Sequence, residues 1–390
     1  MLTDLTEFRI DHSEDELADL RQRIQNARWP EPGTHDSQGI SPDHLRELTD
    51  YWASGYDWMA TQERLNRLPQ FTATVDGLKI HFIHVRSDRP DAIPLILTHG
   101  WPGSFLEFEA VIEPLTAPPA DQPAFHVVIP SLPGYGYSAK PVEPGWNFER
   151  TARAWGELMR GLGYARFVAQ GGDWGSLVTS SMAGEKVDGL AAIHLNLPLI
   201  FPEDPPAQPT PAEQRALSMA AEYSAKGTGY YAIQATRPQT LGYGLADSAI
   251  GQAGWILDKI DEWTDHRGSL WDYLSRDSVL DLISIYWLTS SAASSARYYW
   301  ENARGRGFRG PVIDLPVGVS VFPAELYAPP RHWADAYYPN LIHWNELDRG
   351  GHFAALEQPE TFVSELRTCF ANALEPYASP SRADPAESAG

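Results

Sequence analysis

The segment "RFVAQGGDWGSLVTSSMAG", residues 166–184, decides the fold. It begins with an apolar run typical of a buried strand, passes through the pattern G-x-D-x-G, and continues with small residues that suit a closely packed helix. This spacing is that of a nucleophile elbow, a sharp strand-to-helix turn that usually presents a serine. Here Asp173 stands at the reactive position. The alternative, an aspartate that only caps the helix, stays open at this point.

The composition limits the classes of protein to which the chain can belong. Its 390 residues can bury a substantial core. The formal net charge of −21 argues against nucleic acid as a partner, because such binding needs clustered Lys and Arg. The single cysteine, Cys369, excludes an intramolecular disulfide and leaves too few thiolates for a structural zinc site. We expect neither a metal nor a cofactor.

The N-terminal residues bear on the location of the protein. "MLTDLTEFRIDHSEDE" is acidic and polar where a signal peptide needs a positive start and an apolar stretch. Apolar runs along the chain are too short to span a bilayer. We therefore expect a soluble cytoplasmic protein without a membrane anchor, and the sequence leaves open whether it forms a homodimer.

The first part of the chain predicts helices and then a hairpin. Ser13 and Glu16 have the spacing of a capping box, and Ser41-Pro42 offers a helix cap followed by a first-turn proline. Residues 71–85 form two alternating runs joined by Asp76-Gly77, a strong hairpin signal.

The middle and the end of the chain predict a parallel sheet. Nearly continuous apolar runs, separated by helix-length segments, suit strands that are buried on both faces; they lie at residues 93–100, 125–131, 166–172, 190–197, 315–323 and 340–346. Between the fourth and fifth runs, helical periodicity and dense aromatic residues indicate an inserted helical unit.

These patterns predict the fold class and the domain division. We expect an α/β protein with a mostly parallel sheet, helices on both faces and a helical cap inserted in the core. The expected division is N-terminal helices and hairpin 1–90, core 91–200 and 311–375, cap 201–310 and a disordered tail 376–390.

Residues 95–108, "LILTHGWPGSFLEF", place chemically useful groups after a buried strand. The backbone N–H of Trp101 is expected at the mouth of the sheet, where open α/β sheets bind ligands. Ser104 and Glu107 have the spacing of a capping box for the next helix. The alternative is a tight turn that only ends a strand.

A histidine and an acid follow the elbow in the chain order of hydrolase triads. His352 lies in "DRGGHFAALEQPE" after the last predicted strand, which favours a general base over an ordinary surface histidine. Glu325 directly follows a strand and can accept a hydrogen bond from one imidazole nitrogen. Asp348 is the runner-up for this acid, or a surface charge.

An aspartate at the elbow predicts attack on an alkyl carbon. Its ordinary pKa is about 3.9, so it is ionised at neutral pH without a base. The product of the attack is an ester of the side chain, and His352 then activates water against this ester. The backbone N–H groups of Trp101 and Trp174 are expected to stabilise the oxyanion. The substrate must therefore carry a leaving group, either a halide or an epoxide oxygen.

Tyrosines of the inserted helical unit bear on this choice. An epoxide oxygen leaves as an alkoxide unless a donor meets it, and phenols can donate. The candidates are Tyr230 and Tyr299, which belong to the doublets Tyr230-Tyr231 and Tyr298-Tyr299. Most of the 17 tyrosines are expected to be ordinary core residues.

The chain resembles an epoxide hydrolase of the microsomal type, with an α/β-hydrolase fold, over nearly its whole length. The matching segments follow the order of the family: "LADLRQRIQNARWPE", "YWASGYDW", "LNRLPQFTATVDGLKIHFIHV", "HGWPGSFLEF", "PSLPGYGYS", "QGGDWGS", "GYYAIQATRPQTLGYGLADS", "RYYWEN", "FPAEL" and "RGGHFAALEQPE". The resemblance implies that the N-terminal segment is a meander that wraps the core and packs on the lid. Membrane-bound members of the family have an N-terminal anchor, and this chain departs from them there.

The resemblance also implies roles for single residues. It makes Asp173 the nucleophile, His352 the base and Glu325 its acidic partner. It selects Tyr230 and Tyr299 from the two doublets as the lid donors. The implied reaction consumes a lipophilic epoxide and water and needs no cofactor.

Two other functions compete with this interpretation. A haloalkane dehalogenase has a similar core, and Trp101 and Trp174 can hold a halide through their indole N–H groups. Phenolic donors in the lid and the N-terminal segment favour the epoxide hydrolase. A non-catalytic ligand-binding protein on the same fold is the second alternative, because a fold does not fix a function.

Overall fold

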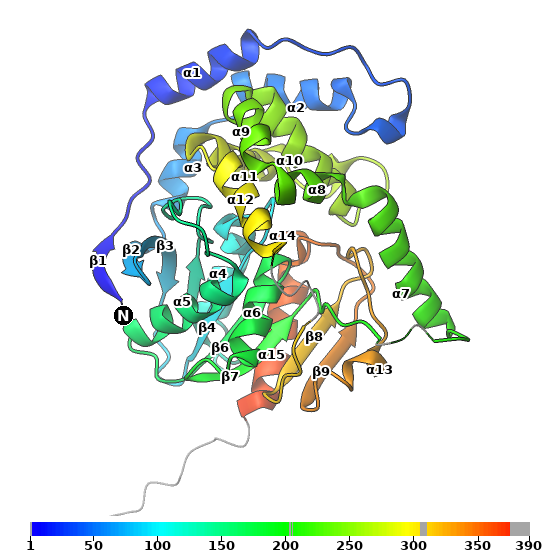
Figure 1. Cartoon of the computed structure of the whole chain (residues 1–390). Coiled ribbons are helices and arrows are strands. Elements are labelled where there is room, and N and C mark those ends of the chain that lie inside the picture. The colour runs from blue at the N-terminus through cyan, green and yellow to red at the C-terminus, as the bar shows by residue number, and fades with distance from the viewer. Residues whose placement is uncertain (1, 203, 205, 305–309, 375–390) are drawn as a thin grey trace, which may run out of the picture.

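The computed structural model describes residues 2–202, 204, 206–304 and 310–374. Within these residues, helices cover both faces of a nine-stranded sheet, and further helices lie above it (Figure 1). The strands are β1 (Thr3–Glu7), β2 (Gln70–Val75), β3 (Leu78–Val85), β4 (Ile93–Thr98), β5 (Phe125–Pro130), β6 (Phe167–Gly171), β7 (Leu190–Leu195), β8 (Val317–Val321) and β9 (Leu341–Glu346).

Helices occupy most of the remaining chain. The helical elements are α1 (Glu14–Gln25), η1 (Asp36–Gln38), α2 (Pro42–Ser54), α3 (Trp58–Leu65), η2 (Phe105–Phe108), α4 (Glu109–Thr116), α5 (Phe148–Gly161), α6 (Trp174–Gly184), α7 (Pro211–Glu222), the π-helical turn η3 (Tyr223–Gly227), α8 (Gly229–Thr236), α9 (Pro238–Asp247), α10 (Ala249–Trp263), η4 (Leu270–Asp272), α11 (Arg276–Leu288), α12 (Ala292–Asn302), α13 (Arg331–Ala334), α14 (Ala354–Glu357) and α15 (Pro359–Leu374).

The sheet has the order β1-β2-β3-β5-β4-β6-β7-β8-β9. The six strands from β4 to β9 pair in parallel, and β1 to β3 are antiparallel additions at one edge. The predicted mostly parallel sheet is therefore confirmed. Strand β4 lies between β5 and β6, so the strand order reverses there, and α/β sheets bind ligands beside such a reversal.

The predicted hairpin is also confirmed, whereas β1 was not predicted. Strands β2 and β3 are joined at Asp76 and Gly77, whose φ angles of 47° and 78° suit the tight turns of hairpins. Strand β1 pairs with β2, but all five of its residues, Thr3–Glu7, are exposed. It therefore lacks the alternation of apolar and polar residues on which strand prediction depends.

The two faces of the parallel strands are covered by different helices. Helix α6 packs on β4, β6 and β7 and is contacted in turn by α5, while α4 and α15 pack together with β5, β7 and β9. Both groups can be followed in Figure 1. The strands between them supply fully buried apolar side chains, among them Leu97 and Val168. This packing buries the sheet on both sides and fixes the ends of its strands.

Helices α7 to α12 follow β7 and precede β8, which is the place predicted for the inserted helical unit. We propose residues 201–310 as this cap. Helices α1 and α2 contact α10 on the side of the cap away from the sheet, and α3 contacts α11 (Figure 1). The predicted tail, residues 376–390, lies outside the described residues.

A buried carboxylate links the N-terminal segment to the cap. Asp281 of α11 accepts hydrogen bonds from Tyr56 and Thr61, and it pairs with Arg64 of α3. Burial raises the pKa of Asp281, although the three partners lower it. These bonds hold α11 of the cap against α3 of the N-terminal segment.

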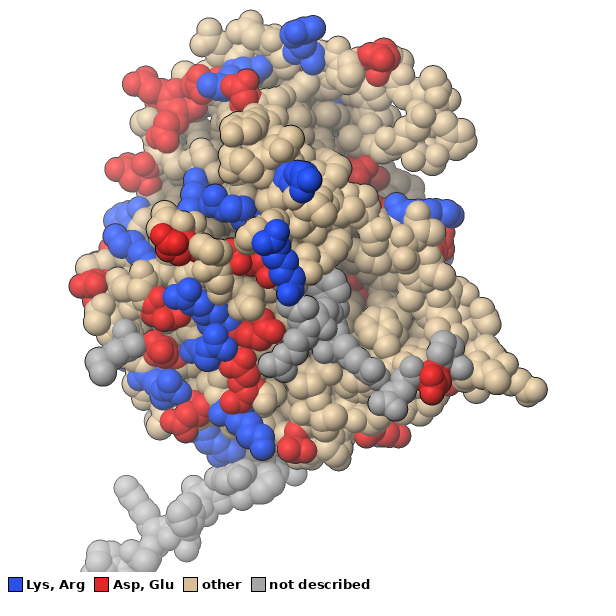
Figure 2. All heavy atoms as spheres, viewed as in Figure 1, with Lys and Arg blue, Asp and Glu red and all other residues tan. Residues whose placement is uncertain are grey.

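The surface carries charges of both signs. Figure 2 shows Lys and Arg side chains among Asp and Glu side chains over α4 to α6, while much of the cap and α7 is uncharged on this face. Among the described helices, none combines the length and the apolar character that a bilayer crossing requires.

Candidate active site

Asp173 occupies the turn between β6 and α6. Its φ and ψ angles are 50° and −126°, a strained conformation for a residue with a side chain. The carboxylate makes no capping hydrogen bond to α6; its Oδ1 instead accepts the backbone N–H of Trp101 at 2.8 Å. This geometry favours the nucleophile elbow over a helix cap.

Glycines around Asp173 allow this turn to form. A side chain at Gly171 would come within 2.0 Å of the carbonyl oxygen of Gly175, and one at Gly175 would come within 1.9 Å of the carbonyl oxygen of Thr98. Strand β6, the start of α6 and the end of β4 therefore approach each other as closely as backbone allows. The pattern G-x-D-x-G follows from this close approach.

His352 lies next to Asp173 on the loop between β9 and α14. Its Nε2 is 3.4 Å from Asp173 Oδ2, and its Nδ1 is 2.7 Å from Oε1 of Glu325. Both His352 and Glu325 are buried, whereas Asp348 is exposed. The structure therefore brings together the predicted nucleophile, base and favoured acid, and it leaves the runner-up acid on the surface.

Charge controls the protonation of His352. Burial alone lowers the pKa of its imidazole, but the neighbouring carboxylates of Glu325 and Asp173 raise this pKa well above the ordinary value. While both neighbours are anionic, the protonated imidazole is favoured. Neutralising Asp173 would remove one of the two stabilising charges.

The predicted oxyanion donors flank the same carboxylate. Trp101 follows β4 and directs its N–H to Asp173, as described above. Trp174 is the first residue of α6, where backbone N–H groups lack intrahelical partners. His99 holds the preceding turn, since its Nε2 accepts the N–H of Leu132.

The two predicted lid tyrosines lie over the tryptophans. The ring of Tyr230 stacks on Trp101 at 5.0 Å between centroids, and the ring of Tyr299 meets Trp174 edge-on at 4.7 Å. Burial raises the pKa of both phenols well above the ordinary value. Both therefore retain their protons at neutral pH and can donate them or hydrogen-bond through them.

Of the second members of the doublets, Tyr298 directs its hydroxyl elsewhere, whereas Tyr231 lines the same cavity as Tyr230 and Tyr299. The hydroxyl of Tyr298 donates to Thr151 Oγ1 at 3.0 Å, on the α5 side of the core. Tyr231 is only partly buried, although it also contacts the ring of Tyr299.

Two aromatic residues of the site were not predicted. The hydroxyl of Tyr223 is 2.9 Å from the hydroxyl of Tyr230, and Tyr223 belongs to the π-helical turn η3. Trp263, at the end of α10, packs its ring 4.9 Å from that of His352 and accepts the N–H of His352 through its carbonyl oxygen. A π-helical turn often marks a functional site, but no sequence pattern predicted the π-helical turn η3.

Two carboxylates fix the loop that carries His352. Glu357 accepts the backbone N–H groups of Gly351 and Phe353, on either side of the histidine, and also that of Asp265. Asp265 in turn accepts the N–H of Gly350. These bonds tie the loop to the end of the cap and set the position of the imidazole.

Asp173 contributes to the walls of two cavities. The larger has a volume of about 320 Å³ and is lined by Tyr223, Tyr230, Tyr299 and mainly apolar side chains, including Leu177, Leu199 and Phe201. The smaller, of about 20 Å³, is lined by His352, Glu107 and the turn after β4. Asp173 thus borders both a mainly apolar chamber and a small space with polar and apolar lining.

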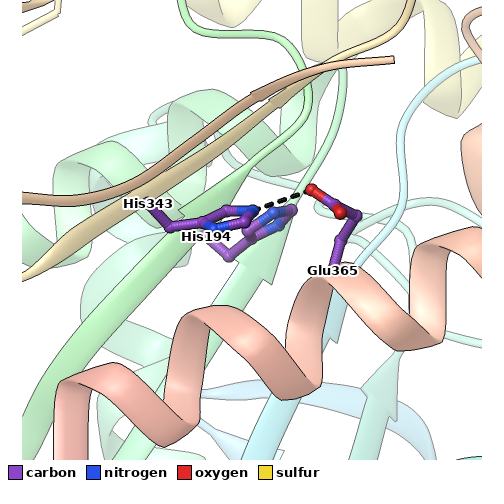
Figure 3. Close-up of side chains that lie close together, drawn as sticks. All are labelled: His194, His343 and Glu365. Atoms are coloured by element: carbon purple, nitrogen blue, oxygen red, sulfur yellow. Dashed lines mark hydrogen bonds and ion pairs between the residues drawn. The ribbon is translucent and has the colours of Figure 1, made fainter. Parts of the chain in front are cut away.

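A second polar cluster lies between the sheet and α15 (Figure 3). It contains His194 of β7, His343 of β9 and Glu365 of α15, and of the described residues it is the one such group with potential metal ligands within 4.8 Å of each other. Glu365 accepts hydrogen bonds from His343, Ser320 and Asn345 at 2.6 to 2.9 Å. Because its carboxylate already has three donors, we interpret the cluster as a tie between α15 and the sheet.

Comparisons with known proteins agree with this geometry. Residues 5–108 match the family described as "Epoxide hydrolase N terminus", and residues 93–241 match "alpha/beta hydrolase fold". A protein of Stigmatella aurantiaca is 53% identical over 94% of this chain and 84% of its own length. Epoxide hydrolase 1 of Sus scrofa is 35% identical over 92% of this chain and 87% of its own.

A solved structure extends the likeness to three dimensions. The crystal structure of juvenile hormone epoxide hydrolase from the silkworm Bombyx mori superposes with a TM-score of 0.89, at 32% identity and 95% coverage of both chains. Similarity of this extent includes the N-terminal segment, the sheet and the helices of the cap. The chain therefore belongs to the epoxide hydrolase family and has the α/β-hydrolase fold.

Proposed function

We propose that this protein converts lipophilic epoxides and water to vicinal diols through an ester of Asp173. The observation that carries the proposal is the position of Asp173, held on a strained turn between the phenols of the cap and the imidazole of His352. Names of the relatives support the same class of substrate.

In the first step, a carboxylate oxygen of Asp173 attacks one carbon of the epoxide. The carbon–oxygen bond of the ring breaks, and its electron pair stays on the epoxide oxygen. Tyr230 and Tyr299, which line the larger cavity, hydrogen-bond to this oxygen and supply its proton. Their raised pKa values ensure that the protons are present before the substrate binds.

In the second step, water hydrolyses the ester. Alkylation has removed the charge of Asp173, so the pKa of His352 falls and the imidazole can act as a base. His352 takes one proton from the water, whose oxygen bonds to Cγ of Asp173, and Glu325 stabilises the resulting imidazolium. The N–H groups of Trp101 and Trp174 stabilise the oxyanion until the diol oxygen leaves and is protonated.

The larger cavity supports an apolar substrate. Its volume of about 320 Å³ lies at the lower end of the range of small-molecule sites, and leucine and aromatic side chains dominate its wall. An epoxide with an aryl or branched alkyl substituent would bury this substituent against the apolar wall and direct its oxygen toward the phenols. A halide leaving group would have no use for the two phenolic protons.

The test is to interrupt the reaction between the steps. In His352→Ala, alkylation should proceed while hydrolysis stalls, so the mass of the intact protein should rise by one substrate mass on addition of a styrene-type epoxide. The exposed His35→Ala is the matched control and should turn over without an adduct. A folded His352→Ala protein that gains no mass with any of several turned-over epoxides would contradict the proposal. Halide release from a bromoalkane, measured in parallel, would redirect it to dehalogenation.

A further inference from the structure

The smaller cavity has the size and the polarity of a site for one water molecule. A cavity of about 10 to 15 Å³ is enough for a water that finds two to four polar partners; this one has about 20 Å³. Its wall combines apolar residues, such as Phe353 and Phe362, with His352, Asp173 and Glu107. Gln170 also lines it, and the buried Oε1 of Gln170 has no hydrogen-bond partner in the structure.

The two cavities divide the proposed reaction between them. Asp173 contributes to both walls. The phenols that would meet the epoxide oxygen line the larger cavity, while the histidine that would activate water lines the smaller one. A water in the smaller cavity would therefore lie beside both the base and the carboxyl that it must attack, on the side away from the bound substrate.

Glu107 and Asp173 pack on the same turn. A side chain at Gly100 would come within 2.1 Å of Asp173 Oδ1, and one at Gly103 would come within 1.3 Å of Glu107 Oε1. The turn of residues 100–103 thus lies directly against both carboxyls, and its glycines leave the space that they fill. Ser104 caps the helical turn that carries Glu107 by accepting the N–H of Leu106.

The environment keeps Glu107 available as a neutral hydrogen-bonding group. Burial raises its pKa to about 8, with a smaller opposing effect from His352 and a further increase from Asp173. Near neutral pH the carboxyl therefore carries its proton, and its carbonyl oxygen can accept a hydrogen bond from water without adding a negative charge to the site.

We propose that Glu107 is a further catalytic residue, which together with His352 holds the attacking water in the smaller cavity against the ester of Asp173. The inference rests on the function proposed above. One O–H of the water points to Nε2 of His352 and transfers its proton there. The other O–H donates to the carbonyl oxygen of Glu107, which orients the water and is not consumed.

Substitution at Glu107 should affect only the second step. Glu107→Met keeps the volume and removes the acceptor, so ester hydrolysis should slow by about 10- to 100-fold, the range expected for the loss of a buried hydrogen bond. Alkylation should stay within about threefold of the wild-type rate. Glu107→Gln retains a carbonyl oxygen and should restore most of the hydrolysis rate. Glu113→Met, an exposed site on α4, is the matched control.

The measurement separates the two steps in one enzyme. In a rapid-mixing experiment stopped at successive times, intact mass gives the fraction of ester, so its rise reports alkylation and its fall reports hydrolysis. Accumulated ester in Glu107→Met, with rescue by Gln, supports the inference. Equal slowing of both steps, or an unchanged rate of hydrolysis, overturns it. If His352→Ala forms no ester either, the proposed function fails; if His352→Ala forms one and Glu107→Met hydrolyses it normally, only the role of Glu107 fails.

Discussion

At the scale of single residues, the mechanism proposed above depends on groups whose charge changes during the reaction. Asp173 and Glu325 contact the two nitrogens of the His352 imidazole and raise its pKa. In the proposed mechanism, His352 is therefore protonated before alkylation and can act as a base after it. The phenols of Tyr230 and Tyr299 have the opposite requirement, since they must hold protons at the start. Burial in the cap meets that requirement.

The phenols give the first prediction. Tyr230→Phe or Tyr299→Phe should slow alkylation by about a hundredfold, within the range of general acid catalysis, and the double variant should be slower still. Tyr243→Phe, on an exposed position of α9, is the control and should leave the rate unchanged. Single-turnover kinetics with enzyme in excess would measure these rates. A double variant with nearly normal alkylation would remove the phenols from the mechanism.

Residues of the site differ in how far the sequence predicts them. Asp173, Glu325 and His352 follow strands, so strand prediction and chain order locate them. Tyr223 and Trp263 reach the site through the tertiary packing of the cap, which no local pattern encodes. In the sequence, Glu107 has only the spacing of a helix-capping residue. A catalytic role is suggested by the cavity that it lines in the structure. Sequence predicts groups at element ends better than groups that meet across elements.

At the scale of elements, close contact between β4, β6 and α6 sets the backbone conformation of Asp173. Gly175→Ala would force its methyl group to within 1.9 Å of the carbonyl oxygen of Thr98. We expect a loss of about 2 to 3 kcal/mol in the free energy of unfolding, as in other overpacked cores, and at least tenfold slower alkylation because the turn must shift.

Gly244→Ala is the control for this prediction. Gly244 lies in α9 with no heavy atom of a neighbour within 4 Å of an added methyl group, so stability should stay unchanged or rise by up to about 1 kcal/mol. Denaturant unfolding and single-turnover rates would test both variants. Equal stability and activity of Gly175→Ala and the wild type would show that the elbow tolerates a side chain there.

The elements themselves were predicted where burial leaves a periodic pattern. Strands β4 to β8 are largely buried and appear as apolar runs, whereas β9 at the edge of the sheet is only partly buried. The turn at Asp76-Gly77 gives the hairpin. Strand β1 was not predicted because its residues are mostly polar and all exposed. Its pairing with β2 joins segments that are far apart in the sequence. The order of the strands in the sheet likewise depends on contacts between distant segments.

At the scale of the whole molecule, buried polar ties connect layers that also pack through apolar side chains. Asp281 joins the N-terminal segment to the cap, and Glu365 joins α15 to β8 and β9. Burial raises the pKa of Glu365, but hydrogen bonds from His343, Ser320 and Asn345 outweigh burial and bring this pKa to about 2. Its ionised form therefore stabilises the folded state.

This tie predicts how stability changes with pH. Glu365→Gln should lower the free energy of unfolding by about 3 kcal/mol at pH 7. The NH₂ group of the new amide would face the donors of His343, Ser320 and Asn345 in place of a carboxylate oxygen. A carboxyl whose folded pKa is depressed stabilises fully above its unfolded pKa of about 4.3 and loses this contribution as the pH falls toward 2. The difference between wild type and variant should therefore shrink over that interval.

Denaturant unfolding between pH 7 and pH 3 would measure this difference. Glu360→Gln, an exposed site on the same helix, should show no comparable loss. A difference for Glu365→Gln that stays constant down to pH 3 would contradict the assigned role of its charge.

The central claim is that Asp173 attacks carbon and that water then attacks Asp173. It is tested most directly by a single turnover in oxygen-18 water with enzyme in excess. In the proposed mechanism, one diol oxygen comes from the epoxide and the other from the Asp173 carboxylate. We therefore expect a nearly unlabelled diol and oxygen-18 in the peptide that contains Asp173. A diol labelled in the first turnover, with an unlabelled Asp173 peptide, would mean that water opens the epoxide directly and would contradict the account.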